Sequence, residues 1–379
     1  MGYESHVERP WLFLLPSPAF WHDPDALHEV VVGVDVARDV RSALRFAFGR
    51  KRSMDGNFTQ FCCSLSNVDT SMLSLPTYVI VTPARNEAQY IELTLKSVIA
   101  QTVRPLKWVI ISDGSTDGMD EIVSRYTTDH PWIELVRMPE RSERHFAGKV
   151  HAFNAGYARM SGLQYDVIVN LDADVSFDED YFSFLLQRLT ENPSLGLVGG
   201  RLVDVTSNKH YKVVDLEYVS GPCQVFRREC FEAIGGYQPL KSGGVDVVAV
   251  LSARATGWQT RTFTDKPYYH HRPMNGAQMK GLRERLHRGR MDYLLGSHPI
   301  WEIVRGVYQM GNRPYVIGGV LILASYFWNC LSGVEQTIPR DLMAFRRKDQ
   351  MERLKCIFHR AAPESLTVSS LRGHKADGN

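Results

Sequence analysis

The chain has 379 residues, which is enough for one large or two moderate domains. Hydrophobic residues make up 44% and charged residues 23% of it, as in folded globular proteins, which excludes a disordered chain. A formal net charge of +2 gives no reason to expect nucleic acid as a partner. The six cysteines contain no Cys-x-x-Cys pair, so we expect the reduced thiols of a cytosolic protein and not a zinc site.

Residues 1–74 have the least regular pattern. The stretch 26–48 fits a short amphipathic helix, and residues 49–55 are basic and loop-like. We expect a poorly patterned N-terminal extension, with Met54 or Met72 as an alternative start of the chain.

Strands and helices alternate from Leu75 onward. β-Branched and apolar runs predict strands at 77–82, 108–112, 133–136 and 166–171. The apolar spacing between these runs predicts helices at 86–99, 119–126 and 150–161. This order predicts an α/β domain over residues 75–275, with a parallel sheet and helices on both of its faces.

The stretch Asn170–Val175 is the centre of the predicted site. Asp172 and Asp174 follow a buried strand two positions apart, so in extended conformation their side chains share one face. Two carboxylates leave positions on Mg²⁺ or Mn²⁺ open for diphosphate oxygens. The alternative is that both side chains only cap a helix at 177–189.

Polar residues also follow the first two strands, Pro83–Glu87 after the first and Asp113 after the second. Ligands of open α/β sheets bind beyond the carboxyl ends of the strands. We therefore expect these residues and the acidic pair to meet at one edge of the sheet.

Four motifs in this order resemble the inverting glycosyltransferases of family 2, which have the GT-A fold. They are Thr82-Pro-Ala-Arg-Asn-Glu, Ser112-Asp-Gly-Ser-Thr-Asp-Gly, Gly148-Lys with Asn154-Ala-Gly, and Leu171-Asp-Ala-Asp. The resemblance covers residues 75–272 and implies a Rossmann-like mixed sheet flanked by helices. It also implies a nucleotide-sugar donor, a divalent metal (Mg²⁺ or Mn²⁺), and transfer of the sugar with inversion at its anomeric carbon.

The resemblance assigns donor binding to the first two loops. Pro83, Arg85 and Glu87 lie where the family binds the nucleoside, and Asp113 is placed to accept a hydrogen bond from the base. The residues also have plainer interpretations. Glu87 suits the positive end of a helix dipole, and Asp113 suits the cap of the helix that follows it.

Further residues of the predicted site would bind phosphate and metal. Lys149 at a helix start and Arg272 are candidates for phosphate oxygens, although Lys149 is also compatible with a solvated surface position. By resemblance, Asp172 lies towards the ribose and the metal, and Asp174 is the more direct metal ligand. Of two adjacent histidines only one can face the cleft, and we assign His271 to the metal by position alone.

The catalytic base is expected in the second half of the chain. Counting back from Gly257-Trp, which ends a predicted helix, places Asp246 at the second carboxylate of the family's Glu-Asp pair. Val245 stands where the family has the Glu, which is a departure. Asp246 would take the proton of the acceptor hydroxyl, the alternative being an N-terminal helix cap.

Residues 276–379 are predicted to form a helical, partly hydrophobic extension. A basic block at 280–290 precedes residues 314–334, which carry no formal charge and are long enough to span a bilayer. Basic residues lie on both sides, so a span, a helix lying in the interface and a buried helix all stay open. We expect membrane association, with the site at the cytoplasmic face of the cell membrane.

Taken with these residues, the resemblance implies a metal-dependent hexosyltransferase. It would move a sugar from a UDP-, GDP- or dTDP-sugar to a hydroxyl of a lipid-linked or surface-polysaccharide acceptor. Two alternatives remain: a non-catalytic, membrane-associated sugar-nucleotide binder, and a haloacid dehalogenase-like phosphatase, whose opening motif is similar to Asp172-Ala-Asp-Val.

Overall fold

The structure is a computed structural model that describes residues 75–140, 147–206, 215–240, 242–272, 281–312 and 314–361. The predicted N-terminal extension, residues 1–74, lies outside these ranges. The cysteines that the structure describes (Cys223, Cys230, Cys330 and Cys356) are free thiols, in agreement with the sequence.

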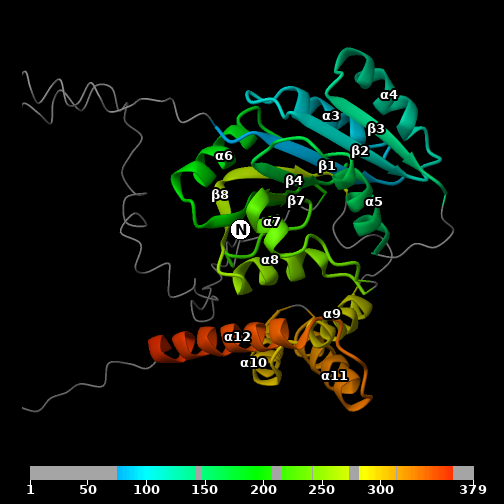
Figure 1. The fold of residues 1–379 in the computed structure, drawn as a ribbon. Coiled ribbons are helices and arrows are strands. Elements are labelled where there is room, and N and C mark those ends of the chain that lie inside the picture. The colour runs from blue at the N-terminus through cyan, green and yellow to red at the C-terminus, as the bar shows by residue number, and fades with distance from the viewer. Residues whose placement is uncertain are drawn as a thin grey trace, which may run out of the picture.

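The described residues contain an eight-stranded sheet, which lies in the upper part of Figure 1, above the C-terminal helices. Its order is β3-β2-β1-β4-β7-β6-β8-β5. Strand β1 pairs in parallel with β2 and β4, whereas β7 runs antiparallel to β4 and β6. The sheet is therefore mixed, because the strand-helix alternation that predicted parallel strands ends at β4. The strands are β1 (Tyr78–Ala84), β2 (Lys107–Asp113), β3 (Ile133–Met138), β4 (Val167–Leu171), β5 (Val175–Phe177), β6 (Leu195–Asp204), β7 (Cys223–Arg227) and β8 (Gln259–His270).

Helices pack on both faces of the sheet. Helices α3 (Ile91–Ile99), α4 (Met119–Asp129) and α6 (Tyr181–Glu191) share one core, and α5 (Ala147–Ala158), α7 (Arg228–Ala233) and α8 (Val245–Ala255) share the other. The side chains of β1 alternate between them: Tyr78 and Ile80 join the first core, Val79 and Val81 the second. A strand buried on both faces reads as a continuous apolar run, which is why it was recognisable in the sequence.

Two predicted helices begin later than expected. Helix α3 begins at Ile91 and not at Asn86, because Asn86 has a φ of 55° and a turn follows in which Tyr90 N–H and Ile91 N–H both donate to the Glu87 carbonyl. Helix α6 begins at Tyr181, because residues 175–177 pair with β8 as strand β5. The first difference comes from the left-handed backbone of Asn86, and the second from pairing with β8, which is distant in sequence.

Four helices form a further layer beside α8 (Figure 1): α9 (Leu282–Leu294), α10 (Pro299–Met310), α11 (Ile317–Leu331) and α12 (Arg340–Ala361). Val248 and Leu251 of α8 pack against Leu295, Ile338 and Leu342 of this layer. The predicted fold class, an α/β domain with a helical C-terminal extension, is confirmed. Over the described residues, no helix has both the length and the apolarity needed to cross a membrane. This includes α11, which has 15 residues and covers most of the stretch 314–334.

Candidate active site

The loops after β1 and β2 are joined by hydrogen bonds. Asn86 N–H donates to Ser115 Oγ at 3.1 Å, Thr116 N–H donates to Asn86 Oδ1 at 2.9 Å, and Ala88 N–H donates to Asp117 Oδ2 at 2.8 Å. Strand β1 lies between β2 and β4, so the loop after β4 is their neighbour at the same edge. The three polar segments singled out in the sequence therefore meet at one edge of the sheet.

Three of the predicted donor-binding residues lie at this edge. Pro83 pairs with Ile111 across the sheet and is half-buried, as is Arg85 just beyond the strand. Asp113 is the last residue of β2 and is buried. Their contact with a nucleoside stays a prediction.

Asp172 is fixed by two contacts at the end of β4. Its N–H donates to the Pro222 carbonyl at 2.8 Å, and its Oδ1 accepts from Lys149 Nζ at 2.5 Å. The Lys149 side chain is 45% exposed, yet the protein around it still desolvates it and so lowers its pKa, while the carboxylates of Asp172, Asp174 and Asp246 raise that pKa further than desolvation lowers it. Lys149 is therefore held as a cation in front of Asp172, where a phosphate oxygen would compete for it.

Asp174 lies in a turn directly after Asp172, so the pair does not have the extended conformation expected from the sequence. The two carboxylates consequently meet different cationic groups. Asp174 Oδ2 is 3.4 Å from Arg272 Nε, and Asp174 Oδ1 is 3.6 Å from His270 Nε2. Asp174 is only 6% exposed, and its Oδ1 has no hydrogen-bond partner. A buried carboxylate oxygen left unsatisfied is costly, so this atom is suited to an added ligand.

His270, and not His271, lies next to the acidic pair. His270 Nδ1 is 2.6 Å from the Arg272 carbonyl oxygen, to which it can only donate, so in the neutral ring Nε2 is left as the acceptor facing Asp174. His271 Nε2 instead lies 2.7 Å from Ser176 Oγ, and burial lowers the pKa of His271. Metal ligation by His271 stays a prediction, but the geometry favours its neighbour.

The residues around Asp174 fit a divalent cation in part. Over the described ranges, no group of three or more His, Cys, Asp or Glu side chains is arranged to hold a metal by itself. The unsatisfied Asp174 Oδ1 and the carboxylate of Asp172 are nevertheless ligand types that Mg²⁺ or Mn²⁺ accepts, and the His270 Nε2 nitrogen suits a transition metal such as Mn²⁺ better than Mg²⁺. Mg²⁺ is commonly held by one or two carboxylates together with substrate phosphates, so a site completed by a diphosphate agrees with this geometry.

Glu87 and Arg272 form an ion pair across the site. Burial raises the pKa of Glu87 to about 7, the nearby Asp174 carboxylate adds to this shift, and Arg272 opposes it. Arg272 thus bridges two acidic side chains from different loops. Its guanidinium lies beside both and would be in reach of phosphate oxygens bound near Asp174.

Asp246 lies in the first turn of α8. Its Oδ2 accepts a hydrogen bond of 2.6 Å from the hydroxyl of Tyr218. Burial, followed by the charge of Asp246, raises the pKa of Tyr218 well above its usual value, so Tyr218 remains the donor of this bond. Gly221 lies so close that a Cβ added to it would be 3.0 Å from Asp246 Cβ.

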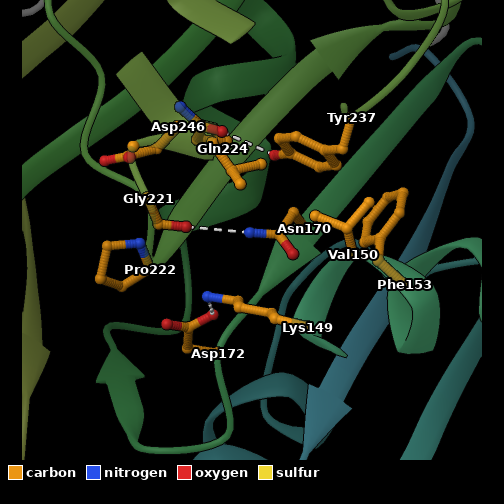
Figure 2. Close-up of a pocket in the computed structure, with 12 residues that line it drawn as sticks. Lys149, Val150, Phe153, Asn170, Asp172, Gly221, Pro222, Gln224, Tyr237 and Asp246 are labelled. Carbon is orange, nitrogen blue, oxygen red and sulfur yellow. Dashed lines mark hydrogen bonds and ion pairs between the residues drawn. The ribbon is translucent and has the colours of Figure 1, made fainter. Parts of the chain in front are cut away.

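A cavity of about 240 Å³ separates Asp246 from Lys149 and Asp172 (Figure 2). Asp246 lies at one end of the view, the Lys149–Asp172 pair lies at the other, and Gly221 and Pro222 lie between them. The cavity is lined by Lys149, Val150, Phe153, Asn170, Asp172, Gly221, Pro222, Gln224, Tyr237, Gly244, Val245 and Asp246. It can thus hold a small polar group with a cation on one side and a carboxylate on the other.

The sequence did not single out Tyr218 or Gly221. Neither belongs to a recognisable motif, and both approach Asp246 only because the segment 215–222 folds back over α8. His270 was visible in the sequence beside His271, but alternation along a strand does not say which neighbour faces the cleft. Contacts between side chains from distant segments thus leave no motif in the local sequence from which they could be predicted.

The sequence profile of a family described as Glycosyl transferase family 2 matches residues 79–243. The poly-β-1,6-N-acetyl-D-glucosamine synthase of Staphylococcus aureus (strain COL) is 30% identical over 136 residues, which are 36% of this chain and 31% of the relative. A synthase of the same name from Staphylococcus epidermidis is 29% identical over 136 residues, again 36% of this chain and 31% of the relative. The match therefore spans about a third of the length of these curated relatives.

A distant structural likeness extends over more of the chain. The mannosyltransferase PcManGT from Pyrobaculum calidifontis, solved with GDP-Man and Mn²⁺, is 17% identical and superposes with a TM-score of 0.46. The superposition covers 76% of this chain and 88% of that one.

Proposed function

We propose that this chain, which contains a glycosyl transferase family 2 domain over residues 79–243, moves a hexose from a nucleotide-diphosphate sugar to a hydroxyl acceptor with inversion. One observation carries the proposal. Asp172, which follows β4 within that domain, and Asp246, which lies three residues beyond its end, lie on opposite sides of one cavity. This is the arrangement that a single displacement needs, with a binder of the leaving group on one side and a base on the other.

The donor diphosphate would lie at the edge formed by Lys149, Asp172, Asp174 and Arg272. A Mg²⁺ or Mn²⁺ held by the two aspartates, with His270 as the nearest imidazole, would neutralise charge on the diphosphate. Lys149 and Arg272 are placed to contact its oxygens by charge-assisted hydrogen bonds. In this proposal Pro83, Arg85, Glu87 and Asp113 hold the nucleoside.

Asp246 would act on the acceptor. It takes the proton of the attacking hydroxyl while that oxygen forms a bond to the anomeric carbon and the bond from that carbon to the diphosphate oxygen breaks. Tyr218 fixes the orientation of the base through the hydrogen bond to Asp246 Oδ2. One displacement inverts the anomeric configuration and leaves no covalent intermediate on the chain.

The relatives support a class of product. Two of them are named for the synthesis of a poly-β-1,6-N-acetylglucosamine, which supports a growing glycan or lipid-linked acceptor for this chain as well. We keep UDP-, GDP- and dTDP-sugars as candidate donors, and we propose that transfer takes place at the cytoplasmic face of the cell membrane.

The proposal is tested by donor binding with and without metal. We expect one nucleotide sugar from a UDP, GDP and dTDP panel to raise the melting temperature of the full chain in the presence of Mn²⁺, and EDTA to remove the increase, because a ligand stabilises the state that it binds. Asp174→Asn should lose this stabilisation, and the exposed control Asp178→Asn should retain it. A donor-induced shift that is the same with Mn²⁺ and with EDTA would contradict a metal site at Asp174.

Product analysis separates the alternatives. Release of a nucleoside diphosphate together with a glycosylated acceptor supports transfer. Metal-dependent binding without turnover would support the non-catalytic binder, for which Val245 in place of a glutamate is the motivating observation. Hydrolysis of a generic aryl phosphate would support the phosphatase, which the family 2 match makes the weaker alternative.

A further inference from the structure

Helices α10 and α11 expose two apolar stripes. On α10 the exposed residues Ile300, Ile303 and Val307 are spaced three and four positions apart, which places them on one face. On α11, Ile317 and Val320 begin a second stripe, which runs through Ala324 to Trp328 and Leu331. Trp328 is 72% and Leu331 85% exposed. Single exposed apolar residues are ordinary, but two contiguous stripes indicate a contact surface.

The two helices are packed together as an antiparallel pair, so the stripes belong to one rigid unit. A Cβ added to Gly306 of α10 would collide with Leu323 of α11, and one added to Gly319 would collide with the Gly306 carbonyl and with Met310. The other side of α11, with Gly318, Ile322 and Tyr326, is buried against the molecule. The connection between the helices adds the exposed Tyr315 and Val316 to the apolar surface.

The described residues of this surface carry no exposed formal charge, whereas charge is present beside it. In the described part of Pro299–Leu331, the only formally charged side chains are Glu302, which is buried, and Arg305, which is paired with Asp292 and Glu302. Helix α9 packs along α11, as the hydrogen bond of 2.7 Å from Ser325 Oγ to the Leu286 carbonyl shows. That helix carries the exposed arginines Arg283 and Arg290 and the exposed leucines Leu282 and Leu286.

We infer that the α10–α11 surface lies in the interfacial layer of a bilayer that contains anionic lipids, with the arginines of α9 at the headgroups. An apolar face with basic residues beside it and Trp or Tyr at its ends is the pattern of helices that lie in the plane of a membrane. Anionic headgroups complement the arginines, whereas a neutral apolar partner would leave them unused. This inference rests on the proposed location at the cytoplasmic face of the cell membrane, and it names the surface that would contact the lipid. It does not depend on sugar transfer, because binding to lipid is measured without any substrate.

The test is cosedimentation of the full chain with vesicles of phosphatidylcholine alone and of phosphatidylcholine mixed with phosphatidylglycerol. We expect binding to the mixed vesicles, weaker binding to the neutral ones, and a decrease of about tenfold or more for the double variant Val320→Asp, Leu331→Asp, which puts two charges into the apolar layer. The matched control is Leu93→Asp, Leu106→Asp, which changes two exposed leucines of the sheet domain and should bind as the unmodified chain does. Circular dichroism melting confirms that both double variants fold.

A second variant tests the charges. Arg283→Glu, Arg290→Glu should reduce binding to the mixed vesicles and leave binding to neutral vesicles unchanged. Equal binding of the unmodified chain and the Val320→Asp, Leu331→Asp variant would overturn the inference, as would failure of the unmodified chain to bind either kind of vesicle. Light scattering that shows a dimer of the unmodified chain and a monomer of the Val320→Asp, Leu331→Asp variant, with no difference in lipid binding, would assign this surface to a second copy of the chain and likewise overturn it.

Discussion

Asp246 and Tyr218 form the pair on which the proposed chemistry depends most directly. Asp246 is the one carboxylate of the predicted Glu-Asp pair that this chain keeps, since Val245 occupies the other position. The hydrogen bond of 2.6 Å from the Tyr218 hydroxyl holds the orientation of this carboxylate. Gly221 leaves room for this arrangement, because any larger residue there would push against the Asp246 side chain.

Substitution of the base by an amide should remove most of the turnover. For Asp246→Asn we expect kcat to fall by on the order of 10²–10⁴, because an amide cannot take up the proton, while donor affinity stays within a few-fold. Steady-state kinetics and calorimetric titration of the donor measure the two effects. Tyr218→Phe keeps the base but removes its hydrogen bond. Its kcat should therefore lie between that of Asp246→Asn and that of the exposed control Asp129→Asn. Unchanged turnover in Asp246→Asn would remove Asp246 from the mechanism.

At the scale of elements, three of the four C-terminal helices, α9, α10 and α12, meet at a buried cluster of charges. Arg305 of α10 is 2.8 Å from Asp292 of α9 and 3.4 Å from Glu302 of its own helix. Arg346 of α12 lies 3.9 Å from Asp292. Burial and the nearby Asp292 carboxylate raise the pKa of Glu302 to about 7. Two carboxylates thus share their cations in a region with little access to water.

This cluster predicts a pH-dependent stability. The folded chain binds the proton of Glu302 more tightly than the unfolded chain does, so the free energy of unfolding should fall as pH rises from about 4.5 to about 7. The loss attributable to Glu302 is on the order of 3 kcal/mol, because one pKa unit corresponds to about 1.4 kcal/mol. Glu302→Gln should lack this part of the slope in urea unfolding at a series of pH values. The control Glu335→Gln, an exposed carboxylate, should keep it, and equal slopes in all three proteins would contradict the assignment.

At the scale of the whole molecule, α12 ties the C-terminal layer to the candidate active site. Arg353 binds Asp215 at 2.8 Å, Glu217 at 2.6 Å and Asp349 at 3.0 Å. Arg254 of α8 shares Glu217 and Asp349 with it. The segment that begins at Asp215 continues to Tyr218 and Gly221, so the same ion pairs hold the residues that contact Asp246.

Loss of Arg353 should therefore affect both stability and turnover. In Arg353→Met three half-buried carboxylates are left with Arg254 alone, and we expect a loss of about 1–3 kcal/mol in the free energy of unfolding, because a partly desolvated charge that loses its partner is costly. We also expect a lower kcat in the folded fraction, since the Tyr218 segment loses its anchor. Arg340→Met, an exposed position on the same helix, is the matched control and should change neither. A stable Arg353→Met variant would show that the ion pairs are dispensable.

The sequence by itself determined the α/β domain, the order of its first strands and the acidic pair after β4. These features depend on local physics: strands buried on both faces are continuously apolar, and ligand-binding residues follow the carboxyl ends of parallel strands. The predicted basic and hydrophobic helical extension was determined in the same way, from composition within short windows.

Only the tertiary structure decided which side chains meet. It placed His270 beside Asp174 and the Tyr218 hydroxyl beside Asp246. It also paired Arg353 with Asp215, in the segment that contains Tyr218. Each contact joins parts of the chain that lie far apart in sequence. The resemblance already implied a mixed sheet, and the structure shows that β7 is the strand that runs antiparallel to β4 and β6. A linear pattern reports the face on which a residue lies, whereas its partner on that face is fixed by the packing of distant segments.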